Sequence, residues 1–163
     1  MSLLNESTVE LAAIEYLRQL GYSTAFGPDI APDGVEPERT SYAQAYLTDR
    51  LHEAMLRINP GFAPSVVDDA IKRLFRAESQ NPLTENSRVH KLLTEGVPVE
   101  HRSDDGSVRT TSIWLVDFDH PENNDWLAVN QFTIIENKNR RPDVLVFLNG
   151  IPVALFELKN LAN

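Results

Sequence analysis

Three charged residues interrupt the most apolar stretch of the chain, which runs from Arg141 to Asn160. Asp143 precedes the first apolar run of this stretch, and Glu157 and Lys159 end the second run. Charged groups are rarely left among apolar residues without an ion pair or a metal, because removing them from water is costly. Carboxylates suit a hard divalent cation, and a neighbouring amine can help to activate water. These residue types predict a metal-dependent hydrolytic site in which Asp143 and Glu157 bind the metal.

The two apolar runs, 144–148 and 151–158, are separated by Asn149-Gly150, a pair that strongly favours a β-hairpin. Both runs are apolar at nearly every position, so we expect both strands to be covered on both faces of a sheet. In a regular strand, Glu157 and Lys159 share one face, because they are two residues apart.

The geometry of the turn decides whether the two carboxylates can share a metal. A regular two-residue turn would put Asp143 and Glu157 on opposite faces of the hairpin. A three-residue loop with Gly150 in the left-handed conformation, or a bulge at Pro152, would return both acids to one face. We therefore predict an irregularity in this hairpin.

The composition limits the class of protein. The chain has 163 residues, of which 42% are hydrophobic, and this is enough for one domain with a real core. It contains no cysteine, so disulfides and thiolate metal sites are excluded. No apolar run reaches membrane-spanning length and no signal peptide is recognisable, so we expect a cytoplasmic protein without a membrane partner.

The formal net charge of −9 argues against an autonomous high-affinity DNA-binding protein, which normally carries a basic surface. A nuclease is still compatible with this charge, because catalytic carboxylates make such sites acidic. Lys138, Arg140 and Arg141 stand just before Asp143 and could contact a DNA backbone. An equally good interpretation of these three residues is a solubilising turn between two strands.

The segment from Asn5 to Leu20 is predicted to be the first helix, because apolar residues recur at helical spacing and Gly21 can end it. The predicted apolar stripe consists of Val9, Ala12, Ala13, Tyr16, Leu17 and Leu20. Glu6 and Glu10 lie four residues apart on one face. Acids are favoured in the first turns by the helix dipole, but one of these two could also reach the metal site. We favour Glu10 over Glu6 for that role.

The rest of the chain is predicted to be a helical part followed by strands. We expect a strand over 22–27, a loop over 28–40, and helices over 42–58, 64–77 and 82–95, which form a helical insert of about 41–95. Further strands follow over 97–102, 108–116 and 126–136, with a turn at 104–106. The polar loop around His120 is explained more simply by Asx-rich turns than by a metal. The prediction is one α/β (α+β) domain over 1–163, with a mixed β-sheet flanked by helices and the insert between the first strand and the main sheet.

Two levels of resemblance follow from these residues. Pro142-Asp143 with Glu157-Leu158-Lys159 resembles the signature of the PD-(D/E)XK nuclease superfamily, a loose pattern by itself. Four longer segments are together similar to the N-terminal domain of type I restriction enzyme R (HsdR) subunits, and they span essentially the whole chain. These segments are NESTVELAAIEYLRQLGY, LTEGVPVEHR, VDFDHPENNDWLAVNQF and RPDVLVFLNGIPVALFELKN.

The resemblance implies a restriction-endonuclease-like fold and the Mg²⁺-dependent nuclease domain of a type I site-specific deoxyribonuclease. It implies that DNA is cleaved after ATP-driven translocation by motor domains, with ATP bound only by the full-length protein. Asp143 and Glu157 match the metal-binding acids, Lys159 matches the catalytic lysine, and Glu10 matches the first-helix glutamate of the site. The implied partners are double-stranded DNA, the modification and specificity subunits, and the motor domains of the same protein.

The sequence departs from the family pattern after Lys159. The family continues into a helix with a Gln-x-x-x-Tyr motif, whereas this chain stops at Asn163 and has no phosphate-binding loop. We therefore expect an N-terminal fragment that lacks the motor, the ATP site and part of the nuclease site. The alternative is a nuclease-fold docking module with little or no catalysis. A stand-alone junction or repair nuclease is disfavoured by the charge and by the whole-chain resemblance.

Overall fold

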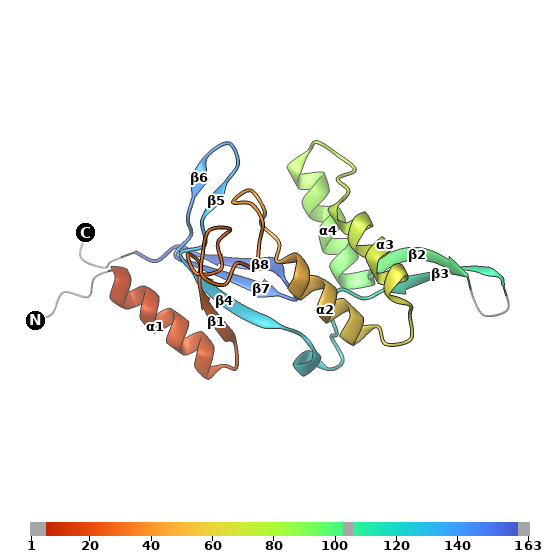
Figure 1. Ribbon diagram of the computed structural model, residues 1–163, viewed down its shortest axis with the longest axis horizontal. Coiled ribbons are helices and arrows are strands. Elements are labelled where there is room, and N and C mark those ends of the chain that lie inside the picture. Colours follow the sequence, from red (N-terminus) through yellow and green to blue (C-terminus); the bar gives the residue numbers. More distant parts are fainter. Residues whose placement is uncertain (1–5, 103–105, 160–163) are drawn as a thin grey trace, which may run out of the picture. The chain divides into compact units, whose positions relative to one another are not determined.

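The computed structural model describes residues 6–102 and 106–159, which form two compact units. The first unit contains the residues up to Arg50 and those from Asp125 onward, and the second contains Leu51–Asn124. The helices are α1 (Glu6–Gln19), α2 (Thr48–Ile58), α3 (Pro64–Phe75) and α4 (Pro82–Glu95), with a short 3₁₀ helix at Pro121–Asn123 (Figure 1). The strands are β1 (Ser23–Phe26), β2 (Val97–Arg102), β3 (Val108–Ile113), β4 (Trp126–Asn130), β5 (Ile134–Ile135), β6 (Asn139–Arg140), β7 (Val144–Leu148) and β8 (Ile151–Phe156). The predicted α/β class is confirmed.

A four-stranded mixed sheet forms the centre of the first unit, in the order β1-β4-β7-β8. β1 runs parallel to β4, whereas β4, β7 and β8 pair antiparallel. β7 is buried at every position, and its side chains alternate between two apolar clusters. Phe147 packs with Phe132 and Leu47 on one face, and Val144 packs with Ile14 of α1 on the other. The expected burial of this strand on both faces is confirmed.

β8 is an edge strand, so the prediction that both strands of the hairpin are covered was wrong for this one. Ile151 is buried, but Val153, Leu155 and Phe156 are 43%, 58% and 42% exposed. Within the described residues, no strand pairs with the outer side of β8. A continuous apolar run therefore did not distinguish a central strand from an edge strand.

The helix α1 directs Glu10, Ala13, Ile14 and Leu17 toward the sheet, a spacing of i, i+3, i+4 and i+7 that defines one helix face. The predicted stripe was displaced from this face, and Tyr16, one of its members, is 64% exposed. The face of α1 that meets the sheet therefore includes the carboxylate of Glu10, which lies near the N-terminal end of the helix.

Residues 28–47 cover the face of the sheet opposite α1 without forming a helix. Ile30 and Leu47 are buried in the cluster on that face, and the Leu47 N–H donates a 2.9 Å hydrogen bond to the Gly150 carbonyl. The helix predicted to begin at residue 42 begins instead at Thr48. The side chain of Leu47 packs against the sheet and is not part of a helical stripe.

Arg50, at the start of α2, ties the covering loop to the sheet. Its guanidinium makes forked hydrogen bonds to the Glu38 carboxylate and a 3.0 Å ion pair with Asp125, the residue before β4. All three side chains are partly buried. The hydrogen bond with Glu38 is the main cause that raises the pKa of Arg50. At this end of the sheet the charged groups therefore compensate one another.

In the second unit, α3 packs on β2, and β2 pairs with β3 in the predicted antiparallel hairpin. Val97 and Val99 of β2 are buried. The predicted turn at 104–106 lies partly outside the described residues. The helices of the predicted insert share this unit with the β2–β3 hairpin. None of the helices in the described part of the chain is long and apolar enough to span a membrane.

Candidate active site at one end of the main sheet

The β7–β8 hairpin contains a β-bulge. Its turn has two residues, Asn149-Gly150, with φ values of 51° and 75°. The first two pairs after the turn, Leu148–Ile151 and Phe147–Pro152, are regular. The register then shifts, so that Val146 pairs with Ala154 and Val153 is the extra residue. The predicted irregularity is therefore confirmed. It is a bulge next to Pro152 and not a longer turn.

The bulge shifts the register in the direction that would bring the two predicted metal ligands to one side of the hairpin. After the bulge, the pairing continues to Val144 opposite Phe156, and one further step in this register sets Asp143 opposite Glu157. Directly opposite residues project from the same face of a sheet. Without the extra residue the two acids would project from opposite faces.

Asp143 is half-buried, and hydrogen bonds hold it on two sides. Its Oδ2 accepts a 2.6 Å hydrogen bond from the Leu158 N–H, and its carbonyl oxygen accepts a 3.1 Å bond from the Gln131 N–H. The Leu158 side chain packs against the cluster that contains Ile14 and Val144. These contacts orient the carboxylate, and within the described residues they leave Oδ1 available to a ligand.

Glu157 and Lys159 are exposed and flank Leu158, which packs inward. Strand alternation therefore directs both side chains away from Leu158 and from the face that α1 covers, so alternation alone does not bring them to Glu10. Among the residues that the structure describes, no three acidic or histidine side chains are grouped closely enough to hold a metal ion. Two carboxylates still fit Mg²⁺, which is commonly bound by one or two carboxylates together with waters and phosphate oxygens. Convergence of all four predicted site residues on one ion stays a prediction.

Glu10 lies at the same end of the sheet, because two amide side chains bind it there. Its Oε1 accepts a 2.7 Å hydrogen bond from Asn130 Nδ2, and its Oε2 accepts a hydrogen bond from Gln131 Nε2. Asn130 is paired with Val144, the residue after Asp143. The side chain of Glu6, the other candidate, lies outside the described residues.

The sequence interpretation missed Asn130 and Gln131, because it assigned both to one strand over 126–136. That assignment was wrong: β4 ends at Asn130, and Gln131 has a φ of 58° that interrupts the strand. The available signal was the pair of adjacent amides directly after the apolar run of Trp126 to Val129. Such amides at a strand end can orient a carboxylate by donating hydrogen bonds to it.

The predicted DNA-contacting cations lie on the connection from Gln131 to Asp143. This connection forms the β5–β6 ribbon, which extends beyond the ends of β4 and β7 (Figure 1). Lys138, Arg140 and Arg141 are all exposed. In the described part of the chain, none of the three forms an ion pair.

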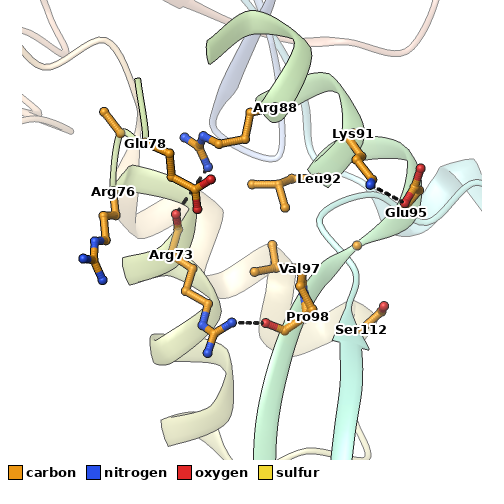
Figure 2. A pocket seen from close by; sticks show the side chains of 12 residues that line it. Arg73, Arg76, Glu78, Arg88, Lys91, Leu92, Glu95, Val97, Pro98 and Ser112 are labelled. Carbon is orange, nitrogen blue, oxygen red and sulfur yellow. Dashed lines mark hydrogen bonds and ion pairs between the residues drawn. The ribbon is translucent and has the colours of Figure 1, made fainter. Parts of the chain in front are cut away.

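A second candidate is a cavity of about 920 Å³ in the second unit, where α3 and α4 end beside β2 (Figure 2). Its basic lining residues are Arg73, Arg76, Arg88 and Lys91. Arg73 donates a 2.8 Å hydrogen bond to the Pro98 carbonyl, and Arg88 donates to the carbonyl oxygens of Arg73 and Leu74. Cations near a helix C-terminus compensate its unpaired carbonyls. These side chains are therefore used by the fold itself.

The loop around His120 is built from Asx turns, as the simpler interpretation predicted. The Asp117 carboxylate accepts hydrogen bonds from Asn123 Nδ2 at 2.8 Å and from the His120 N–H at 2.9 Å. The hydrogen bond from Asn123 is the largest cause that lowers the pKa of Asp117. Local hydrogen bonding accounts for the polar residues of this loop.

Comparison with known proteins points to one family. Residues 3–163 match the family model described as type I restriction enzyme R protein N terminus. The chain is 33% identical over 160 residues to the type I restriction enzyme HindI endonuclease subunit of Haemophilus influenzae. It is 35% identical over 162 residues to the putative type I restriction enzyme MjaIXP endonuclease subunit of Methanocaldococcus jannaschii. These matches cover 97% and 96% of this chain, which spans 15% of the length of each relative.

Replacing Glu10 with alanine should lower the free energy of unfolding by about 2 kcal/mol, because the amides of Asn130 and Gln131 would be left without their acceptor. Urea denaturation followed by circular dichroism measures this change. Glu15→Ala on the same helix is the control, since the Glu15 side chain is 52% exposed and pairs with Arg18 at the surface, where an ion pair contributes little. Equal destabilisation by both variants would contradict an anchoring role for Glu10.

Proposed function

Because the chain belongs to the family of type I restriction enzyme R protein N termini, we propose that it is the DNA-cleaving module of such an enzyme. The proposed reaction is Mg²⁺-dependent hydrolysis of DNA phosphodiester bonds at a site of the PD-(D/E)XK type. The observation that supports this proposal is the bulge at Val153, because the shifted register, continued one step beyond the Val144–Phe156 pair, would set Asp143 opposite Glu157. A purely structural hairpin would benefit little from that offset, because the residues of β8 after the bulge are exposed.

Asp143 and Glu157 would hold Mg²⁺ through their carboxylate oxygens. When bound, the ion would polarise the scissile phosphate and stabilise the negative charge that develops in the transition state. The hydrogen bond from the Leu158 N–H fixes one oxygen of Asp143 and so orients the other toward the ligand position. A fixed carboxylate matters here, because Mg²⁺ requires a nearly ideal octahedron of ligands.

Lys159 and Glu10 would act on the attacking water. Lys159 follows Glu157 by two residues, so an extended backbone directs both side chains to one side. The amine would position the water or accept its proton. Glu10 is already oriented by two amide donors, and its carboxylate would hold a water at the same end of the sheet.

The cations of the β5–β6 ribbon would contact the DNA backbone beside the cleavage site. Lys138, Arg140 and Arg141 are exposed on the connection that leads directly to Asp143. Phosphate contacts of this kind orient a duplex without reading its sequence. They provide local positive charge on a chain whose net charge of −9 otherwise repels DNA.

In the full-length protein, this module would cut DNA after translocation by ATP-driven motor domains. The modification and specificity subunits would supply methylation and sequence recognition. The chain spans only 15% of the length of its relatives, so the motor and its ATP site would lie in the remaining part of such a protein.

The chain should bind Mn²⁺ as a substitute for Mg²⁺, and Glu157→Gln should weaken that binding because it removes a charged ligand. We expect affinity to fall at least about tenfold, the usual cost of removing even a residue that only orients a metal ligand. Isothermal titration calorimetry measures both affinities. Glu100→Gln, an exposed acid of β2, is the control and should bind normally. Undiminished binding by Glu157→Gln would favour a docking module without catalysis.

In the full-length subunit assembled with its partners, Asp143→Ala or Lys159→Ala should abolish DNA cleavage and leave ATP hydrolysis and translocation intact. The reason is that both residues would serve the phosphodiester chemistry and not the motor. Gel analysis of circular DNA and an ATPase assay on the same sample measure the two activities. Lys72→Ala, an exposed lysine bonded to Asp69, should cut normally. Double-strand cutting by either site variant would refute the assignment.

Replacing Lys138, Arg140 and Arg141 together with alanine should weaken binding of the chain to a short duplex at low salt. The slope of log K against log salt should become shallower by about 1 for each phosphate that the protein no longer neutralises. Fluorescence anisotropy over a salt series measures this slope. A triple alanine variant of Lys72, Arg76 and Lys91 removes the same charge from the second unit. An equal effect of both triples would mean that only net charge matters, against the proposed contact.

A further inference from the structure

Gln131 has a backbone conformation that its residue type disfavours. Its φ of 58° lies in the left-handed region, and within the described residues only one other non-glycine residue, Asn149, has a positive φ. Left-handed backbone is uncommon outside glycine, asparagine and aspartate, because the Cβ atom approaches the following carbonyl oxygen. Strain of this kind persists where the surroundings impose it, and it is concentrated at functional sites.

The residues around Gln131 are closely packed on two sides. Gly27, after β1, approaches so closely that a Cβ atom on it would lie less than 3.0 Å from the Gln131 carbonyl group. Phe132 is fully buried and makes an edge-to-face contact with Phe147 at 5.2 Å between ring centroids. The Arg39 guanidinium carbon lies 3.8 Å from the centroid of the Phe132 ring. The segment is therefore fixed before and after Gln131.

Gln131 contacts two acids of the proposed site at once. Its Nε2 donates to Oε2 of Glu10, and its backbone N–H donates a 3.1 Å hydrogen bond to the Asp143 carbonyl oxygen. Asn130 Nδ2 donates to the other oxygen of Glu10 at 2.7 Å. Both oxygens of the Glu10 carboxylate are thus oriented by amides from the end of β4. One residue thereby connects α1 with the start of β7.

We propose that Gln131 is a positioning residue, whose left-handed backbone and side-chain amide together fix Glu10 relative to Asp143. Its side chain acts on metal binding through Glu10 and does not contact the metal. This inference rests on the proposed function, since it requires a metal at Asp143 and Glu157. Glycine would adopt the same backbone at a lower cost, but it would leave Oε2 of Glu10 without its donor. The side-chain amide is therefore what glutamine supplies here and glycine would lack.

The test compares Gln131→Gly with Gln131→Ala by Mn²⁺ calorimetry and by thermal unfolding of the chain. Both variants lack the amide that orients Glu10, and Glu10 would hold a water of the metal ion, so both should bind Mn²⁺ about tenfold more weakly, the low end of the range for residues that support a metal's ligands. Only glycine relieves the backbone strain, so its Tm should equal or exceed that of the parent and exceed that of the alanine variant. Weaker metal binding at unchanged stability is a result that a merely structural residue would not give.

Two further variants sharpen the test. Asn149→Gly relieves the same kind of strain at the opposite end of β7 and should leave Mn²⁺ binding unchanged. If Gln131 acts through Glu10, then Gln131→Gly combined with Glu10→Gln should bind no more weakly than Glu10→Gln alone. Additive weakening by the two changes would contradict this coupling.

The outcomes separate the inference from the function on which it rests. Parent-like Mn²⁺ affinity in Gln131→Gly, together with weakened binding in Glu157→Gln, would overturn the role of Gln131 and leave the proposed function standing. Absence of Mn²⁺ binding by the parent chain would overturn both. A Tm of Gln131→Gly far below that of the parent would overturn the argument from strain.

Discussion

Strand alternation is the constraint on which the candidate site depends, because only side chains an even number of positions apart share a face of a strand. With a two-residue turn and regular pairing, Asp143 and Glu157 would project from opposite faces, and the extra residue Val153 shifts the register by the one position that the proposed site requires. An extra residue in a central strand disturbs the pairing on both sides. In the described chain β8 is paired on one side only, so the bulge disturbs a single ladder. The bulge therefore costs less in β8, an edge strand, than it would in a central strand.

The sequence could predict the parts of the fold that local residue chemistry determines. Asn149-Gly150 specified a tight hairpin, and the apolar runs on its two sides specified strands, although burial on both faces was predicted correctly for β7 and wrongly for β8. The bulge was predictable for another reason, since no propensity favours an extra residue at Val153. It followed from the requirement that Asp143 and Glu157 share a metal. A chemical hypothesis about two side chains thus predicted a feature of the backbone.

The features that escaped prediction are those fixed by residues distant in the sequence. α1 has apolar residues on several sides, including the exposed Leu11 and Tyr16, so periodicity alone could not identify the face that meets the sheet. The strand predicted through Gln131 ends early at a left-handed residue, where Gly27 approaches the backbone closely and Phe132 is buried. Neither the approach of Gly27 nor the burial of Phe132 can be recognised from the residues next to Gln131. The position of Glu10 and of its two amide donors depends on this arrangement.

The two ends of the β4–β7 pair differ in their electrostatics, and this difference favours the proposed cation position at one end. At one end Asn149 accepts a hydrogen bond from the Asp125 N–H, and the Asp125 carboxylate is paired with Arg50 at 3.0 Å. At the other end, neither Glu10 nor Asp143 has an ion-pair partner among the described residues, and amides and a backbone N–H orient them. Neutral donors fix a carboxylate without cancelling its charge. The first end already has its counter-charge, whereas the second holds oriented carboxylates whose charge a divalent cation would neutralise.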